Sequence, residues 1–281
     1  MNISPAFSVN IFSDLQTIFK YDFMLHAFQA GTIVAVVAGF VGYFIVLRRS
    51  AFAAHALSHV GFTGAAGACL IGLNPIVGLL LFTMSGGLLM GLLGRKVASR
   101  DIQIGTVLAF MLGLGVLFIS LYSGYATEAY SLLFGEILGI SSSNVTVTLL
   151  AGILILIVLA IFYRPLLFTS LDEDVAEAKG LSVLGIGLIF MLLIAVATSI
   201  AVQVVGVLLI FALMVTPAAI AHRLASRPFD GIAISVLIAV FATWLGLFIS
   251  FYLPYPVSFF ITSIVFVIYI LVRLISSIQC F

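Results

Sequence analysis

Charge is the component that this sequence has least of. Its 281 residues include 11 Lys and Arg and 10 Asp and Glu, together 7% of the chain, whereas a soluble domain carries about a quarter. A water-soluble globule needs far more charge to cover its surface, while a chain solvated by lipid needs an apolar exterior. The scarcity excludes a soluble fold, and the net charge of +1 gives no basic surface for nucleic acid.

Several catalytic motifs are also absent. The two cysteines, Cys69 and Cys280, form neither a disulfide framework nor a CxxC metal motif. The sequence contains no GxSxG nucleophile motif and no GxxxxGK[ST] phosphate-binding loop. We therefore expect a protein that is not an enzyme and needs no cofactor. If ATP drives its activity, another polypeptide must bind the ATP.

Long apolar runs dominate what is present. A helix crosses a hydrocarbon core of about 30 Å in about 20 residues, and an open sheet cannot cross it. Nine runs are long enough; the break at 202–204 is the weakest, so eight is the alternative number. The runs are 24–47, 51–72, 75–94, 102–122, 145–163, 181–201, 204–222, 231–252 and 257–274. The predicted fold is an all-α, polytopic integral membrane helix bundle.

The cations predict the orientation of these spans. If residue 24 starts outside, ten of the 11 Lys and Arg residues fall on one side of the membrane and only Lys20 on the other. This pattern places the basic side in the cytoplasm, together with the C-terminus, and the N-terminus outside. Residues 1–22 are then an extracytoplasmic segment, either a short helix in the membrane interface or a frayed apolar tail. Residues 23–281 form one transmembrane domain.

Two short segments do not fit as simple connections. Residues 131–140 are apolar but too short to span, which favours a re-entrant half-helix entering from the outer face. Residues 168–180 are polar, with acids at the start and Lys179 near the end, as the helix dipole favours. The second segment predicts a short cytoplasmic surface helix with Gly180 as its C-cap.

The sharpest motif is the pair His55 and His59. Residues at i and i+4 share one helix face about 6 Å apart, near enough for both imidazoles to bind one divalent cation. Polar groups at this depth in a membrane are expensive and usually functional. The alternative, in which each histidine only bonds a neighbouring helix, remains equally open. The small residues around the pair suit either close helix packing or the lining of a pathway.

Two imidazoles leave the coordination shell of a metal incomplete. Asp22, Glu128 and Glu136 are candidates to complete it, but the sequence does not rank them. An intramembrane metalloprotease is disfavoured, because Ala56 stands where a zinc protease of this His spacing has its general base.

Four ordered motifs resemble those of the metal-type ABC importer permeases, the family for zinc, manganese and iron. They are GYFIVLRRSAFAAHALSHVGFTGAAGA at 42–68, LLFGEILGIS at 132–141, SLDEDVAEAKGL at 170–181 and VVGVLLIFALMVTPAAIAHRLA at 204–225. The resemblance implies a homodimeric permease in a bacterial plasma membrane. It also implies cytoplasmic ATP-binding subunits and an extracytoplasmic metal-binding protein as partners.

The resemblance also assigns residues. His59 matches the family's intramembrane metal histidine, and the segment with Asp172, Ala176 and Gly180 matches its coupling element for the ATPase. The family usually has an aspartate where this chain has His55. Exchanging a carboxylate for an imidazole favours zinc over manganese, so we expect a zinc importer. Manganese or iron import, a stand-alone channel or secondary carrier, and a membrane scaffold protein are the alternatives.

Overall fold

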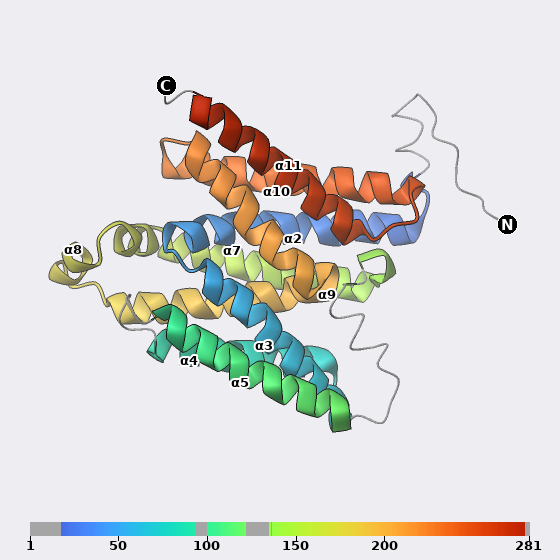
Figure 1. The fold of residues 1–281 in the computed structure, drawn as a ribbon, viewed down its shortest axis with the longest axis horizontal. Helices are drawn as coiled ribbons and strands as arrows, with labels where there is room; N and C mark the ends of the chain where they lie inside the picture. The colour runs from blue at the N-terminus through green and yellow to red at the C-terminus, as the bar shows by residue number, and fades with distance from the viewer. Residues whose placement is uncertain (1–17, 94–99, 122–134, 136, 279–281) are drawn as a thin grey trace.

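The computed structural model describes residues 18–93, 100–121, 135 and 137–278 (Figure 1). Every regular element in these ranges is helical. The helices are α2 (Asp22–Leu47), α3 (Ala51–Leu70), α4 (Pro75–Leu93), α5 (Arg100–Leu121), η2 (Ile137–Gly139), α7 (Ser142–Leu171), α8 (Glu173–Ala178), α9 (Val183–Leu224), α10 (Pro228–Tyr252) and α11 (Val257–Ile278). The all-α prediction is therefore confirmed for the part of the chain that is described.

Seven of these helices are long and apolar enough to cross a membrane, namely α2, α4, α5, α7, α9, α10 and α11. The helix α3 is not among them, because its two histidines and many small residues lower its mean hydropathy. The helix α9 counts once, although its 42 residues would extend about 63 Å if straight, twice the thickness of a bilayer core. Length and composition therefore support a bundle that crosses the membrane several times. By these two criteria the described residues contain seven candidate spans, not the nine expected.

The chain reverses direction inside α9, at Gly206. This residue has φ 82° and ψ 162°, far from helical values. Near the start of α9, the Phe190 ring lies 6.5 Å from that of Phe44 on α2; near its end, the His222 ring stacks on Tyr43 at 4.4 Å. Both ends of α9 thus lie beside the same part of α2, and Figure 1 shows the two halves running in opposite directions. The expected break at 202–204 is real but lies at Gly206, where glycine tolerates the positive φ.

The reversal in α9 packs directly against a second glycine. Gly135 has φ 75°, and a Cβ there would lie 2.5 Å from the backbone nitrogen of Gly206. The one-turn helix η2 follows this contact. Residues 131–134 and 136 of the predicted re-entrant half-helix lie outside the described residues, as do residues 1–17 of the predicted N-terminal segment.

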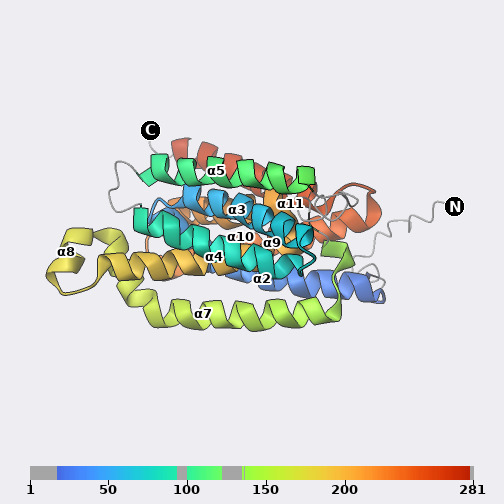
Figure 2. The same ribbon diagram turned by 90° about the horizontal axis from the view of Figure 1, so that it is seen from below.

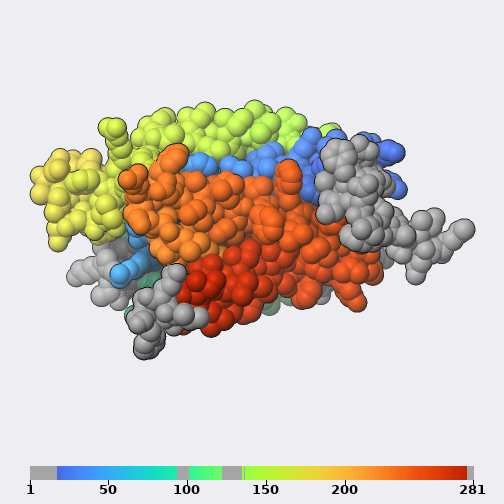
Figure 3. All heavy atoms as spheres, turned by 90° about the horizontal axis from the view of Figure 1, so that it is seen from above, coloured from blue at the N-terminus to red at the C-terminus, as the bar shows by residue number. Residues whose placement is uncertain are grey.

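The core of the bundle is built around α2 and α9, which carry most of its fully buried apolar side chains. Large apolar side chains also cover much of the outside, for example Phe110, Ile161 and Phe266, as lipid requires. Figure 2 shows α7 running along one edge of the bundle beside α2. The short helix α8 projects beyond the ends of its neighbours at one end (Figure 3). The C-terminal ends of α2, α7 and α11 lie at this same end of the bundle (Figure 1).

Candidate metal-binding site

A tight turn sets the direction of α3, the helix that carries both histidines of the predicted site. Arg49 adopts φ 53°, a left-handed conformation that is uncommon for a residue with a side chain. The Ser50 amide then donates to the Ile45 carbonyl at 2.8 Å, and Ser50 Oγ donates to the Arg48 carbonyl at 3.2 Å. These bonds close the end of α2 and start α3 at Ala51.

Small residues let α3 pack closely on α4 and α5. A Cβ on Gly64 would overlap the carbonyl oxygen of Gly78 on α4. On the α5 side, Thr63 Oγ1 donates to the Met111 carbonyl at 2.8 Å, and a Cβ on Gly115 would lie 2.8 Å from that hydroxyl. Of the two interpretations of the small residues, close packing therefore holds on these two sides of α3.

His55 and His59 share one face of α3, as their spacing predicts. Their ring centroids lie 4.8 Å apart with an interplanar angle of 83°. Both residues are half-buried, and His55 Nδ1 is a buried nitrogen with no hydrogen-bond partner. A buried polar atom without a partner is rare in proteins and needs an explanation, such as a water or an ion. The pair therefore offers an unused nitrogen to a cation.

Phe211 is a neighbour of the pair that the sequence did not indicate. It lies on the second half of α9, and its ring centroid is 4.9 Å from that of His55, with the rings at 66°. The contact joins positions 156 apart in the chain, so no local pattern contains it. It covers one side of the His55 imidazole with an apolar ring and narrows the directions from which a ligand reaches it.

Within the described residues, no third His, Cys, Asp or Glu joins the pair. No group of three or more His, Cys, Asp and Glu that could hold a metal occurs among the described residues. Asp22 stands exposed at the start of α2. Glu128 and Glu136 lie outside the described residues. Of these four residue types, the described chain thus supplies two imidazoles to the site.

The predicted coupling segment contains a short helix with well-formed ends. Asp172 Oδ1 accepts from the Val175 amide at 3.0 Å and caps α8, while Ala176 is fully buried. After α8, Gly180 takes φ 81°, and the Leu181 amide donates to the Ala176 carbonyl at 3.1 Å, which is a Schellman ending. Residues 168–171 belong to α7, because Asp172 is extended at φ −153° and breaks the helix. The surface helix is therefore shorter than 168–180.

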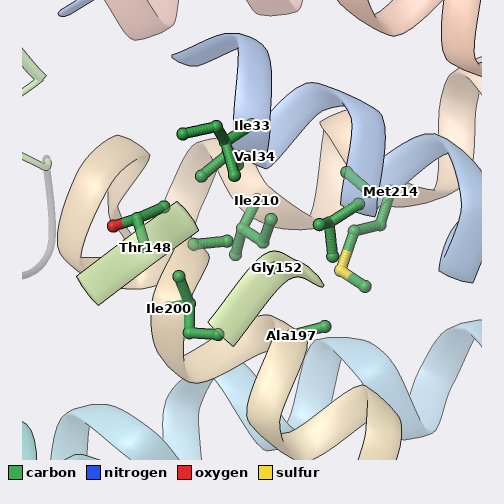
Figure 4. Close-up of a pocket in the computed structure, with 11 residues that line it drawn as sticks. Ile33, Val34, Thr148, Gly152, Ala197, Ile200, Ile210 and Met214 are labelled. Atoms are coloured by element: carbon green, nitrogen blue, oxygen red, sulfur yellow. The ribbon is translucent and has the colours of Figure 1, made fainter. Parts of the chain in front are cut away.

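A separate, small pocket lies between α2, α7 and both halves of α9 (Figure 4). Thr148 is its one residue with a polar side chain, and that hydroxyl donates to the Asn144 carbonyl at 2.7 Å. Neither His55 nor His59 lines this pocket. Its chemistry is apolar, so it is not the metal site.

Comparisons with known proteins agree on one family. The family described as "ABC 3 transport family" matches residues 20–276. The "Manganese transport system membrane protein MntC" of Listeria innocua serovar 6a is 32% identical over 238 residues, covering 84% of this chain and 85% of that protein. The "Manganese import system permease protein ScaB" of Streptococcus gordonii is 32% identical, with the same coverage of 84% and 85%.

A solved structure is similar over nearly the whole chain. It is described as "PsaBC from Streptococcus pneumoniae in complex with Fab". The TM-score is 0.83 at 29% identity, and the match covers 94% of this chain and 95% of the other. The helix arrangement described above is thus similar to one in a solved structure.

Proposed function

Because the chain belongs to the ABC 3 transport family, we propose that it is the membrane-spanning subunit of an ATP-driven importer for divalent metal ions. The observation that carries the proposal is the pair of half-buried imidazoles on α3, with rings 4.8 Å apart and one buried nitrogen unused. Two protein ligands hold a cation weakly enough to release it, whereas a closed shell of four would trap it.

The proposed bundle crosses the membrane nine times. The seven candidate spans become nine when α3 is added and α9 is divided at Gly206. The end of the bundle with α8 then faces the cytoplasm, because three cations lie at this end. Arg48 follows α2, Arg223 is in the last turn of α9, and Arg227 precedes α10. Residues 131–140 would enter from the opposite, outer side, where Gly135 contacts the reversal of α9.

Manganese is the cargo that the relatives favour. Both curated relatives above are named for manganese transport, and the sequence-based expectation of zinc finds no support among them. Zinc remains a second candidate on one observation, the His55 imidazole, because nitrogen ligands suit zinc better than they suit manganese. The two candidates predict different relative uptake of Mn²⁺ and Zn²⁺. Measuring the uptake of both ions by the same protein therefore distinguishes them.

The proposed partners follow from the family. Cytoplasmic ATP-binding subunits would dock on α8, an extracytoplasmic metal-binding protein would deliver the ion, and a second copy of the chain would complete the membrane part. On ATP binding, movement of α8 would switch access to the His55 and His59 pair from the outer side to the cytoplasm. The projection of α8 beyond the bundle gives such a partner an accessible surface (Figure 3).

Metal uptake by cells that depend on this protein tests the proposal. We expect ATP-dependent accumulation of radioactive Mn²⁺, and at least a tenfold loss in His59→Ala, since even an outer-shell change at a metal site costs about 10- to 100-fold in affinity. His26→Ala is the matched control, because His26 is half-buried at the start of α2 and away from the pair. Normal uptake in His59→Ala would refute the site.

Co-purification separates the other classes of function. The proposal requires an ATPase subunit to accompany the chain through purification in mild detergent. Uptake without any ATPase subunit would favour a stand-alone channel or secondary carrier. Unchanged cellular metal content in every histidine variant would favour a scaffold protein.

A further inference from the structure

Arg48 connects three parts of the bundle at the end that carries α8. It follows the last residue of α2 and stands seven positions before His55. Its Nη1 donates to Thr169 Oγ1 at 2.7 Å and to Ser170 Oγ at 3.3 Å, both in the last turn of α7. Its guanidinium carbon also lies 5.5 Å from the centre of the Phe190 ring on α9.

The hydroxyls that Arg48 holds stand directly before α8. Asp172, the N-cap of α8, comes two residues after Ser170. Thr169 is almost fully buried and donates to the Pro165 carbonyl at 3.0 Å, while Ser170 donates to the Leu166 carbonyl. Each hydroxyl therefore donates within α7 and accepts from Arg48, which leaves the cation bound to a well-ordered turn.

On its other side, Arg48 is joined to the start of α3. Its carbonyl accepts from Ser50 Oγ at 3.2 Å, and the Ser50 carbonyl accepts from the Ala54 amide at 3.1 Å in the first turn of α3. One short path of bonds thus leads from the N-cap of α8 through Arg48 to the helix that presents His55 and His59. A bond from a charged donor is stronger and more directional than one between neutral groups.

The surroundings of this contact leave room for movement. Arg48, Thr169 and Ser170 line a solvent-open pocket of about 420 Å³, together with Leu47, Arg49, Asp101, Leu171 and Glu173. The contact between the end of α7 and the turn between α2 and α3 therefore borders open space on one side. A displacement of α8 would reach the turn before α3 through the polar contact of Arg48.

We propose that Arg48 is a positioning residue that transmits the movement of α8 to α3 and so couples ATP hydrolysis to the opening of the histidine pair. The inference rests on the proposed function, because it requires an ATPase partner at α8. Arg48 does not touch the metal in this scheme. Its effect is on the coupling between two sites, which is a free energy distinct from either binding affinity.

The test uses the complete transporter, with its ATPase subunits and its metal-binding protein, in proteoliposomes. Two quantities are measured for each variant: ATP hydrolysed and Mn²⁺ transported. We expect Arg48→Gln to retain the ATPase subunit and to hydrolyse ATP, while Mn²⁺ transported per ATP falls by at least about fivefold, the lower end of usual coupling factors. A residue that served only stability would lower both quantities together.

Thr169→Val tests the same contact without removing a charge, because valine keeps the shape of threonine. It should lower Mn²⁺ transported per ATP in the same direction as Arg48→Gln. The double variant should be no worse than Arg48→Gln alone, since residues in one contact do not add independently. Arg49→Gln is the matched control and should keep wild-type coupling, because Arg49 is the adjacent, exposed cation in the same turn.

The outcomes separate this inference from the proposed function. If the wild-type transporter shows no ATP-dependent Mn²⁺ or Zn²⁺ uptake, the proposed function fails and the inference fails with it. If the wild type transports metal while Arg48→Gln keeps its ratio of metal to ATP, the inference alone is overturned. Parallel loss of hydrolysis and transport in both Arg48→Gln and Thr169→Val would also overturn it, since that result describes assembly and not coupling.

Discussion

The two imidazoles on α3 form a donor pair without negative charge. Their rings lie 4.8 Å apart, and the apolar ring of Phe211 lies 4.9 Å from that of His55. A cation between them gains nitrogen coordination but no charge compensation from these two residues. Selectivity at such a pair depends on how well each metal tolerates nitrogen ligands, and Mn²⁺ is better served by oxygen than Zn²⁺ is.

His55→Asp should therefore shift selectivity toward manganese. The carboxylate supplies a hard oxygen ligand and a negative charge, so uptake of Mn²⁺ relative to Zn²⁺ should rise about tenfold, equivalent to roughly 1.4 kcal/mol. The measurement is competitive uptake of the two radioactive ions from one mixture. His55→Asn is the control that supplies an oxygen ligand without charge, and an unchanged ratio in His55→Asp would contradict the argument.

The sequence predicted the histidine pair but not its environment. Spacing of four positions determines that both side chains share a helix face, because this follows from helix geometry alone. The position of Phe211 depends on how α9 folds back against α3, which no local pattern contains. For the same reason, the sequence could not rank Asp22 among the candidate ligands; the structure shows it exposed at the start of α2.

Between elements, the contact of α3 with α4 depends on glycine. Gly64→Leu should lower the free energy of unfolding by at least about 1–3 kcal/mol, the usual cost of overpacking, because a Cβ already overlaps the Gly78 carbonyl. Gly113→Leu is the control, since a Cβ there meets nothing within 4 Å. Thermal unfolding of the purified complex in detergent measures both, and equal midpoints would show that the close approach is unimportant.

The contact of Gly135 with the reversal of α9 allows a second comparison. Gly72→Ala introduces only backbone strain, about 1–2 kcal/mol, because Gly72 has φ 72° and open space around it. Gly135→Ala has the same strain at φ 75° and also meets the backbone of Val205 and Gly206. Its unfolding midpoint should therefore fall further than that of Gly72→Ala. Equal shifts in the two variants would mean that the packing adds nothing.

Element boundaries were predictable where hydropathy determines them. The run 24–47 became Asp22–Leu47, and 51–72 became Ala51–Leu70, since turn residues and charges end these runs. The range 168–180 was less accurate because α7 continues through apolar Phe168 and Leu171 until Asp172 breaks it. A capping side chain can end one helix and begin the next, and composition alone does not show at which residue this happens.

Across the whole molecule, the few charged residues lie mostly near helix ends, and the middle of the bundle is apolar. Hydropathy predicted a polytopic helical fold, and the structure has one. The span at 51–72 is less apolar than the others, since two histidines and many small residues replace large apolar side chains there. Of the eight long helices in the described residues, the one outside the candidate spans, α3, carries the candidate site.

Single-cysteine labelling tests the proposed nine crossings. In a variant without Cys69 and Cys280, cysteines at Asn74 and Tyr255 should react with a membrane-impermeant maleimide added to intact cells. Cysteines at Lys179 and Arg227 should react only after the membrane is opened, because they lie at the end of the bundle that carries α8. Labelling of Arg227→Cys in intact cells would mean that α9 crosses only once, which leaves eight spans.

The reversal at Gly206 also has a consequence for how the protein is made. The two halves of α9 meet at one residue with non-helical dihedrals, so no hydrophilic loop separates them. A nascent chain can then enter the lipid with both halves together as a helical hairpin, without transferring a polar segment to the far side. Biosynthesis of this region would depend on early pairing of its two helices and not on the independent insertion of each.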